Sequence, residues 1–228
     1  MKGFLRPFAL GMGLLVGLAV VAGCGGGEES ASAQGGQMPD ELVMGIIPAE
    51  DNQEMVRLFQ PVADYMGEEL GTEIELYTAT DYSGIIEAMR SGNVDLAWYG
   101  PLSYVLANEV ADAEAIAVQT TEEGVKDPSY HSLMITQADS GITEIEDLEG
   151  KSFAFVDPAS TSGNLFPRKA FDEAGMDPEK DLAESTYAGG HDASALAVTN
   201  GTVDGAAVAD TTFDLMVEEG TINESEFR

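Results

Sequence analysis

Short apolar segments alternate with amphipathic segments from Leu42 to the end of the chain. The run LVMGIIP at 42–48 is apolar throughout and ends at a proline, which is typical of a buried strand. The segment 49–71 repeats apolar residues at helical spacing, starts with acidic residues and ends at a glycine, so we expect a helix. The alternation predicts further strands over 73–79, 94–100, 113–121, 132–137, 151–157, 182–189 and 203–210, further helices over 82–92, 101–111, 163–175, 191–201 and 211–220, and a helical turn over 142–150.

This order of elements predicts the fold class. Strands that alternate with helices form open α/β sheets with helices on both faces. The alternation stops at a polar connector, 122–131, and then starts again. We therefore expect an α/β protein with two lobes, at 41–121 and 122–228, and a ligand cleft between them.

The first forty residues have the pattern of an export signal. Lys2 and Arg6 precede an uncharged apolar run over 8–23, which is shorter than the ~20 residues that span a bilayer. The run ends in VAGC, the pattern of a bacterial lipobox, although an ordinary signal peptide beside a chance cysteine is the alternative. The pattern predicts a lipoprotein signal peptide at 1–23, lipidation of Cys24, a flexible Gly/Ser tether at 24–40, and an extracytoplasmic protein that a lipid anchors to the membrane.

Composition excludes several functions. The chain has 10 basic and 41 acidic residues, a net charge of −31, which becomes −33 when removal of 1–23 takes away Lys2 and Arg6. No basic patch for nucleic acid can form from so few cations. One cysteine and two histidines leave no internal disulfide and little support for a metal site, and no motif calls for a cofactor. We expect a folded protein with an acidic surface.

The stretch DPASTSG, at 157–163, carries the strongest candidate chemistry. In open α/β sheets ligands bind beyond the carboxyl ends of strands, and this stretch follows the strand expected over 151–157. Ser160, Thr161 and Ser162 precede a helix that needs only one capping hydroxyl, so we expect the others to bind a ligand. We also expect Gly163 to let the backbone approach that ligand. Hydroxyls at a helix N-terminus predict a site for a tetrahedral oxyanion without a cationic side chain.

Four other residues follow strands and are weaker candidates. His191 follows the strand expected over 182–189 and is a possible oxyanion donor, although a structural hydrogen bond is the alternative. Asp210 either caps its helix or accepts a hydrogen from a protonated or amine-bearing ligand. Tyr82 and Tyr99 are either core aromatics or phenols that close the cleft. We expect the neighbouring Asp192 to cap its own helix instead of touching the ligand.

Four segments together resemble the phosphonate-binding proteins of phosphate, phosphite and phosphonate ABC importers. They are GIIPAED, ATDYSGIIEAMRSGNVDLAWYGPLSYVLA, DPASTSGNLFP and GGHDASALAVTNGTVDGAAVAD, in that order. The resemblance implies a two-lobed periplasmic-binding-protein-like fold of type II, a monomer, and delivery of a small phosphorus oxyanion to an ABC permease. It implies that the ligand is bound by Tyr82, Tyr99, Ser160, Thr161, Ser162, His191 and Asp210.

The chain departs from this family at its C-terminal end. Family members continue past the helix that TTFDLMVEEG resembles, cross back to the first lobe, and end in a further segment. This chain stops at INESEFR, so the second crossover is missing and the second lobe is incomplete. Either the sequence is a fragment or the protein lacks this crossover, and we expect a fragment, because a lobe without a strand exposes an open sheet edge.

Two alternative functions stay open at this point. One is a secreted hydrolase with Ser162 as nucleophile, His191 as base and Asp210 as the residue that orients it, although no G-x-S-x-G motif is present. The other is a sensor that passes oxyanion occupancy to a signalling partner. The interpretation that we favour is a binding protein without enzymatic activity.

Overall fold

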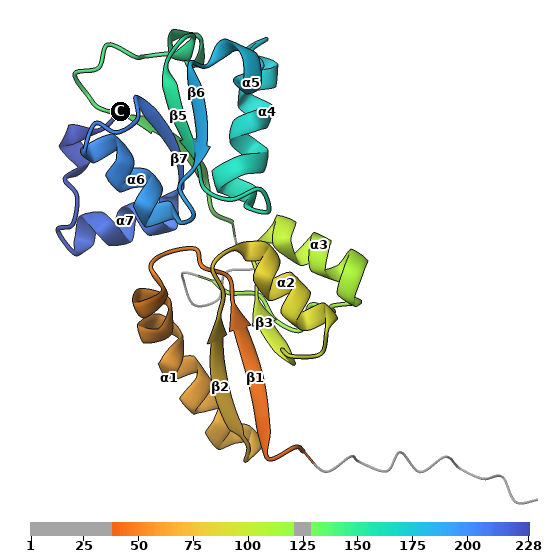
Figure 1. The fold of residues 1–228 in the computed structure, drawn as a ribbon. Coiled ribbons are helices and arrows are strands. Elements are labelled where there is room, and N and C mark those ends of the chain that lie inside the picture. The colour runs from red at the N-terminus through yellow and green to blue at the C-terminus, as the bar shows by residue number, and fades with distance from the viewer. Residues whose placement is uncertain (1–37, 121–128) are drawn as a thin grey trace, which may run out of the picture. The chain divides into compact units, whose positions relative to one another are not determined.

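The computed structural model describes residues 38–120 and 129–228, and its strands form two sheets (Figure 1). The first sheet has the order β2-β1-β3 and is parallel throughout. Since crossover connections are right-handed, this order puts α1 and α2 on opposite faces of the sheet, and α3 packs against α2. The bounds are β1 (Glu41–Ile46), α1 (Asn52–Leu70), β2 (Glu73–Thr78), α2 (Tyr82–Arg90), β3 (Leu96–Trp98) and α3 (Pro101–Ala111).

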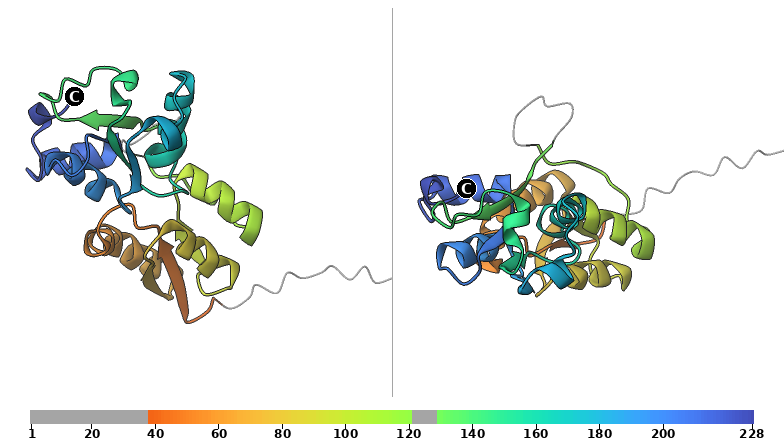
Figure 2. Two further views of the ribbon diagram at one scale, coloured as in Figure 1. Left: turned by 45° about the horizontal axis from the view of Figure 1, so that its top comes forward. Right: turned by 90° about the horizontal axis from the view of Figure 1, so that it is seen from above.

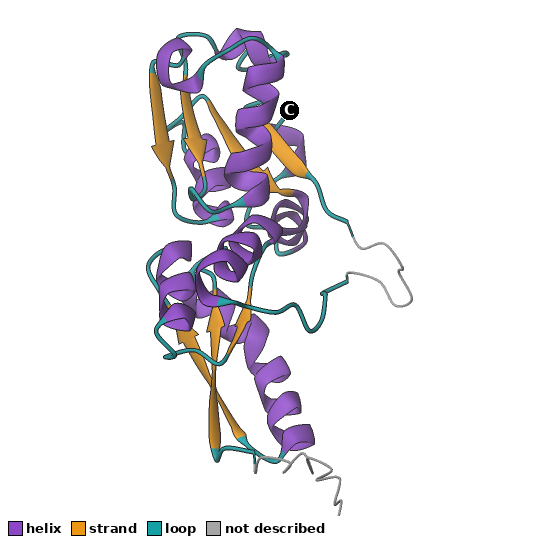
Figure 3. Cartoon of the chain, turned by 90° about the vertical axis from the view of Figure 1, so that its right-hand side faces the viewer, coloured by secondary structure: helices purple, strands orange, loops and turns teal. Residues whose placement is uncertain are grey.

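The second sheet has the order β4-β7-β5-β6, in which only β4 runs antiparallel to its neighbour (Figure 3). The last residues of the chain extend its edge, because Thr136 and Arg228 exchange two backbone hydrogen bonds of 3.0 Å. The bounds are β4 (Ser132–Thr136), η1 (Ile145–Leu148), β5 (Ser152–Phe155), η2 (Thr161–Leu165), α4 (Phe166–Glu173), α5 (Pro178–Asp181), β6 (Glu184–Tyr187), α6 (His191–Thr199), β7 (Gly205–Ala209), α7 (Asp210–Glu218) and η3 (Glu224–Glu226).

Strand alternation builds a core on each face of the second sheet. Successive side chains of a strand point to opposite faces. Phe153 and Phe155 therefore pack with Phe171 of α4, whose ring lies 5.2 Å from that of Phe153. Ala154 and Val208 face the other way, toward α6 and α7. The two views of Figure 2 show these helices on either side of the strands.

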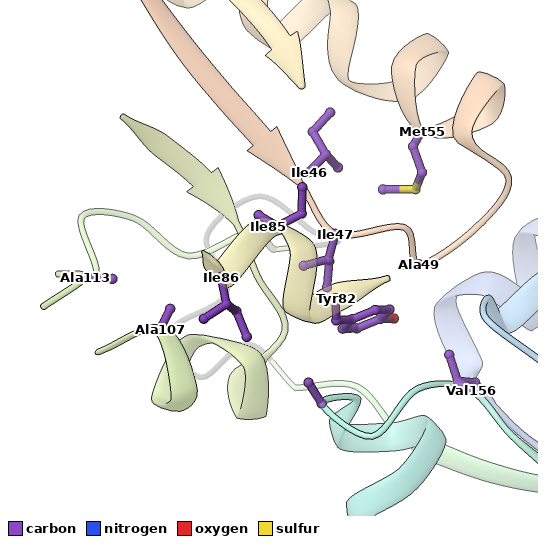
Figure 4. Close-up of a cluster of buried hydrophobic side chains, with 11 residues drawn as sticks. Ile46, Ile47, Ala49, Met55, Tyr82, Ile85, Ile86, Ala107, Ala113 and Val156 are labelled. Atoms are coloured by element: carbon purple, nitrogen blue, oxygen red, sulfur yellow. The ribbon is translucent and has the colours of Figure 1, made fainter. Parts of the chain in front are cut away.

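Another buried cluster joins residues of both expected lobes. It contains Ile46, Ile47 and Tyr82, together with Val156 and Ala159 from the segment that follows β5. Figure 4 shows the ring of Tyr82 beside Ile47 in this cluster. The segment that carries the three hydroxyls is therefore packed against the carboxyl end of β1 and the start of α2.

One predicted strand is wrong. Residues 113–120 have no regular structure, and Ile116 and Val118 are 78% and 70% exposed. An apolar run forms a strand only where a neighbour can share its backbone hydrogen bonds. Here the segment makes a side-chain contact instead, because Trp98 Nε1 donates to Gln119 Oε1 at 2.8 Å.

The helix predicted over 163–175 starts earlier and in a wider turn. Residues Thr161–Leu165 form a π turn in which the Phe166 amide donates to the Thr161 carbonyl, and α4 begins at Phe166. Pro167 lies in the first turn of α4, where its missing N–H costs nothing. The short helix α5, which begins at Pro178, was not expected.

The expected boundaries of the chain's parts stay predictions. The signal peptide at 1–23 and most of the tether at 24–40 lie outside the described residues, as does the division near residue 121. We call the described residues 41–120 the first lobe and 129–228 the second lobe. Within the described residues, no helix is both long and apolar enough to cross a membrane.

Candidate functional site

The three hydroxyls of DPASTSG have three different environments. Ser160 caps the following turn, because its Oγ accepts from the Gly163 amide at 3.0 Å. Thr161 Oγ1 instead accepts from the Leu102 amide in the first lobe, at 2.8 Å. Ser162 is buried, and its Oγ has no hydrogen bond with another described residue. One hydroxyl therefore caps the helix, as expected, and the other two do not.

Gly163 is required for the packing of the turn against β5. A Cβ at this position would lie 2.3 Å from the side chain of Val156, which is closer than any real contact. The Val156 amide also donates to the Gly163 carbonyl at 2.9 Å. The absent side chain lets the turn fold back onto the end of β5, and the approach of this backbone to a ligand stays a prediction.

His191 is held as a neutral hydrogen-bond donor. Its side chain is 5% exposed at the start of α6, and its Nδ1 accepts from the Ala209 amide at 3.0 Å. A nitrogen that accepts an N–H carries no proton, so the ring proton lies on Nε2. Burial lowers the pKa of His191 to about 4, because the charged form would lose its hydration. At neutral pH the ring is an uncharged donor through Nε2.

Tyr82 lies beside these donors and Tyr99 does not. Tyr82 is 2% exposed, and burial raises the pKa of its phenol, with Asp157 adding to the rise and the nearby Ser160 opposing it. The phenol of Tyr99 donates to the Ile85 carbonyl of α2 at 3.4 Å, and burial raises its pKa to about 12. The structure thus gives Tyr99 a place in the core of the first lobe. Its expected role in the cleft has no support from this geometry.

Tyr130 is a candidate that the sequence analysis missed. Its partly buried phenol is close enough to Tyr82 to contribute to the raised pKa of that residue, after burial and Asp157. Tyr130 stands in the polar connector that joins the lobes, where no periodic pattern marks it as part of a site.

The carboxylates near the site have partners that the sequence did not predict. Asp210 lies 2.7 Å from Nδ1 of His131, the other histidine, and also accepts from the Thr211 amide. We expected Asp192 to cap its own helix, and this prediction is wrong: α6 has Gly190 at its N-cap and no side-chain cap. Its Oδ2 instead accepts from the Asp51 amide of the first lobe at 3.1 Å.

Asp157 was also missed as part of this site. It is 5% exposed, its Oδ1 accepts from the Ala159 amide at 2.7 Å, and its Oδ2 accepts from the Tyr82 amide at 3.3 Å. Burial raises its pKa, and these hydrogen bonds oppose the rise. Its position at the end of a strand, before a proline, was the available signal.

The hydrolase alternative is not supported by these contacts. In the hydrolase alternative, His191 would activate Ser162 through one ring nitrogen, and Asp210 would have to bond to the other ring nitrogen. Nδ1 of His191 is bonded to the Ala209 amide, and Asp210 is paired with His131. The proposed triad is therefore not assembled.

The arrangement is suited to binding an anion. Ser160, Thr161 and His191 each use an acceptor atom on a backbone N–H, so each keeps a hydrogen that it can donate. Among the described residues, no group of three or more His, Cys, Asp or Glu could hold a metal ion, and five basic residues form ion pairs. Ion pairs with Asp or Glu are formed by Arg57, Arg90, Arg168, Lys169 and Lys180.

Comparison with known proteins places this site in a family. The family model described as "ABC transporter, phosphonate, periplasmic substrate-binding protein" matches residues 44–228. The phosphate-import protein PhnD of Mycolicibacterium smegmatis is 33% identical over 218 residues, which are 92% of this chain and 68% of that protein. The phosphonates-binding periplasmic protein of Escherichia coli is 36% identical over 167 residues, 72% of this chain and 48% of that protein.

The fold agrees with a solved structure. The binding protein component of an ABC phosphonate transporter from Pseudomonas aeruginosa has a TM-score of 0.76 and 30% sequence identity, and the match covers 82% of this chain and 63% of that one. The chain thus spans about half to two thirds of the length of these relatives. By its sequence and its type II periplasmic-binding fold, the chain belongs to the family of phosphonate ABC transporter periplasmic substrate-binding proteins.

Proposed function

We propose that the protein captures a small phosphorus oxyanion, a phosphonate, phosphite or phosphate, and delivers it to an ABC permease. The observation that carries this proposal is the set of donors whose acceptor atoms are already bonded to backbone N–H groups. The two hydroxyls each keep one hydrogen to donate, and His191 can only donate through Nε2, so the set favours a ligand with several acceptor oxygens. The relatives named for phosphate and phosphonate support this ligand class.

The proposed ligand contacts are those predicted from the resemblance, except that Tyr130 is added and Tyr99 is left out. Ser160, Thr161, Ser162 and the Nε2–H of His191 donate to the oxyanion. Asp210 accepts a hydrogen from a protonated oxygen or an amine of the ligand. The phenols of Tyr82 and Tyr130 complete the site, and Tyr99 supports the first lobe from within its core.

Short-range hydrogen bonds have to dominate this binding. A net charge of −31 repels an anion at long range and slows its capture. Inside a cleft with little water each hydrogen bond is stronger than at the surface. The two lobes would close over the ligand at the connector between them, so that the closed state signals loading to the permease. The protein acts as a monomer in this proposal.

Calorimetric titration tests the ligand class. We expect one of phosphite, phosphate, methylphosphonate and 2-aminoethylphosphonate to bind at least about tenfold more tightly than the others, a difference of ~1.4 kcal/mol. Sulfate is the control, since it is a tetrahedral oxyanion without a proton at neutral pH. No heat of binding for any phosphorus oxyanion, in a folded sample, would contradict the proposal.

We also propose that Cys24 is lipidated and anchors the protein to the outer face of the membrane. The support is the VAGC pattern at the end of an export signal. Replacing Cys24 with Ser should move the protein from the membrane fraction to the soluble fraction of cells, because one thiol carries the lipid. Continued membrane association of Cys24→Ser, detected by immunoblot, would contradict the anchor.

A further inference from the structure

Three helices of the first lobe have an N-terminal N–H that is bonded to a side chain of the second lobe. The Asp51 amide, at the N-cap of α1, donates to Asp192 Oδ2 at 3.1 Å. The Tyr82 amide, the first of α2, donates to Asp157 Oδ2 at 3.3 Å. The third contact is from the second residue of α3 to Thr161 Oγ1, at 2.8 Å. We call these three contacts the trans caps.

The trans caps take N–H groups that the helices' own caps leave unsatisfied. The first N–H groups of a helix have no partner inside it. Among the described residues, the carboxylate of Asp51 accepts only from the Gln53 amide, and that of Asp81 accepts only from the Gly84 amide. Helix α3 begins after Gly100 and has no side-chain cap from its own lobe. The second lobe therefore supplies partners that are missing in the first.

The charges explain how two carboxylates can stand beside an anion site. Asp157 and Asp192 would repel a bound oxyanion if nothing balanced their charge. Each instead lies at the positive end of a helix, where an anionic group is stabilised. The helices α1 and α2 have 19 and 9 residues, so each has a developed dipole.

Each trans cap is next to a proposed ligand contact. Asp157 shares its loop with Thr161, which is itself both a cap and a donor. Asp192 follows His191, whose own amide donates to the Ala49 carbonyl of the first lobe at 2.7 Å. When the lobes separate, these contacts and the convergence of the donors are lost together.

We propose that Asp157 and Asp192 are positioning residues that hold the lobes closed by capping first-lobe helices in trans. This inference rests on the proposed oxyanion binding and adds how that binding is coupled to closure of the lobes. Part of the binding free energy depends on how much of the protein is closed before ligand arrives. Loss of the Asp157 or the Asp192 cap therefore weakens oxyanion binding without removing any proposed ligand contact.

The test compares Asp192→Ala with a cap of the same chemistry inside one lobe. Asp177 caps α5 through the Glu179 amide at 3.1 Å and has no contact with the first lobe among the described residues. We expect Asp192→Ala to lower the affinity for methylphosphonate or phosphate about 5- to 20-fold and to enlarge the radius of gyration of the ligand-free chain in X-ray scattering. Asp177→Ala should keep the affinity within about twofold and leave the radius unchanged. Asp192→Asn should fall between wild type and Asp192→Ala, since it keeps an acceptor oxygen and loses the charge.

The outcomes separate this inference from the proposed function. If wild type binds an oxyanion and Asp192→Ala binds it equally well, the trans caps do not hold the closed state and the binding function stands. An equal loss in Asp177→Ala would also overturn the inference, because the effect would then be general to capping. If wild type binds neither methylphosphonate nor phosphate, the proposed function fails. X-ray scattering then tests the trans caps alone, and equal radii of gyration for wild type and Asp192→Ala would contradict the inference.

Discussion

Replacing Thr161 with Val is expected to weaken oxyanion binding by roughly 100-fold or more. Val keeps the shape of the side chain but removes Oγ1, which accepts from the Leu102 amide at 2.8 Å and is proposed to donate to the ligand. A lost hydrogen bond to a charged group costs about 1.5–3 kcal/mol, and an N–H left buried without a partner costs about 1–3 kcal/mol more. Each 1.4 kcal/mol corresponds to about tenfold in affinity.

Thr161→Ser is the matched control, because it restores the hydroxyl in the same place. We expect its affinity to stay within about threefold of wild type, from calorimetric titration with the ligand that binds most tightly. The melting temperature of Thr161→Val should change little, since the Leu102 amide can bond to water when the lobes are open. Equal affinity of Thr161→Val and wild type would exclude this hydroxyl from the site.

Stability is expected to fall as the pH drops from about 6.5 to about 4, because of His191. Its pKa is lowered to about 4 in the folded protein from an ordinary value of 6.5, so between these values the unfolded chain binds the proton and the folded one does not. Protonation therefore favours unfolding in this window, and the stabilisation is fully present only above the unfolded pKa. The loss between pH 7 and pH 4.5 should be roughly 2 to 3 kcal/mol of unfolding free energy.

His191→Gln isolates this effect from other titrating groups. Gln offers an oxygen that can accept from the Ala209 amide and an amide that can donate, but it does not titrate in this range. Urea unfolding of both proteins at pH 7 and pH 4.5 should show a steeper loss in wild type by that amount. Burial raises the pKa of Asp157 and of Glu50, so both carboxyls act in the opposite direction and cancel in the comparison. Parallel pH profiles for the two proteins would mean that His191 is not held neutral.

The alternation of apolar and amphipathic segments was enough to predict most elements, because each pattern is local. The strand at 151–157 and the helix at 191–201 were located to within a few residues as β5 and α6. The strand predicted over 113–121 failed because a strand needs a neighbour that the local pattern does not specify. The apolar pattern was present in this segment, but no neighbouring strand pairs with its backbone among the described residues.

The candidate site was predicted in its composition and only partly in its contacts. The sequence predicted that one of the three hydroxyls caps the helix, because a cap bonds to a residue nearby in the chain, and the structure shows that this residue is Ser160. The partner of Thr161 lies 59 positions away and that of Asp192 lies 141 positions away, so neither follows from local spacing. Tyr99 was selected for its place after a strand, but the direction of its side chain is decided by the packing of α2.

The sequence alone determined the fold class, the family and the stretch of hydroxyls, since these depend on residue types in a fixed order along the chain. The tertiary structure decided which atoms of those residues are donors and which are already occupied. Nδ1 of His191 and Oγ1 of Thr161 are acceptors because backbone N–H groups from distant segments meet them. Hydrogen bonds depend on separation in space. Packing within the second lobe brings the Ala209 amide to 3.0 Å from His191, and packing of one lobe against the other brings the Leu102 amide to 2.8 Å from Thr161.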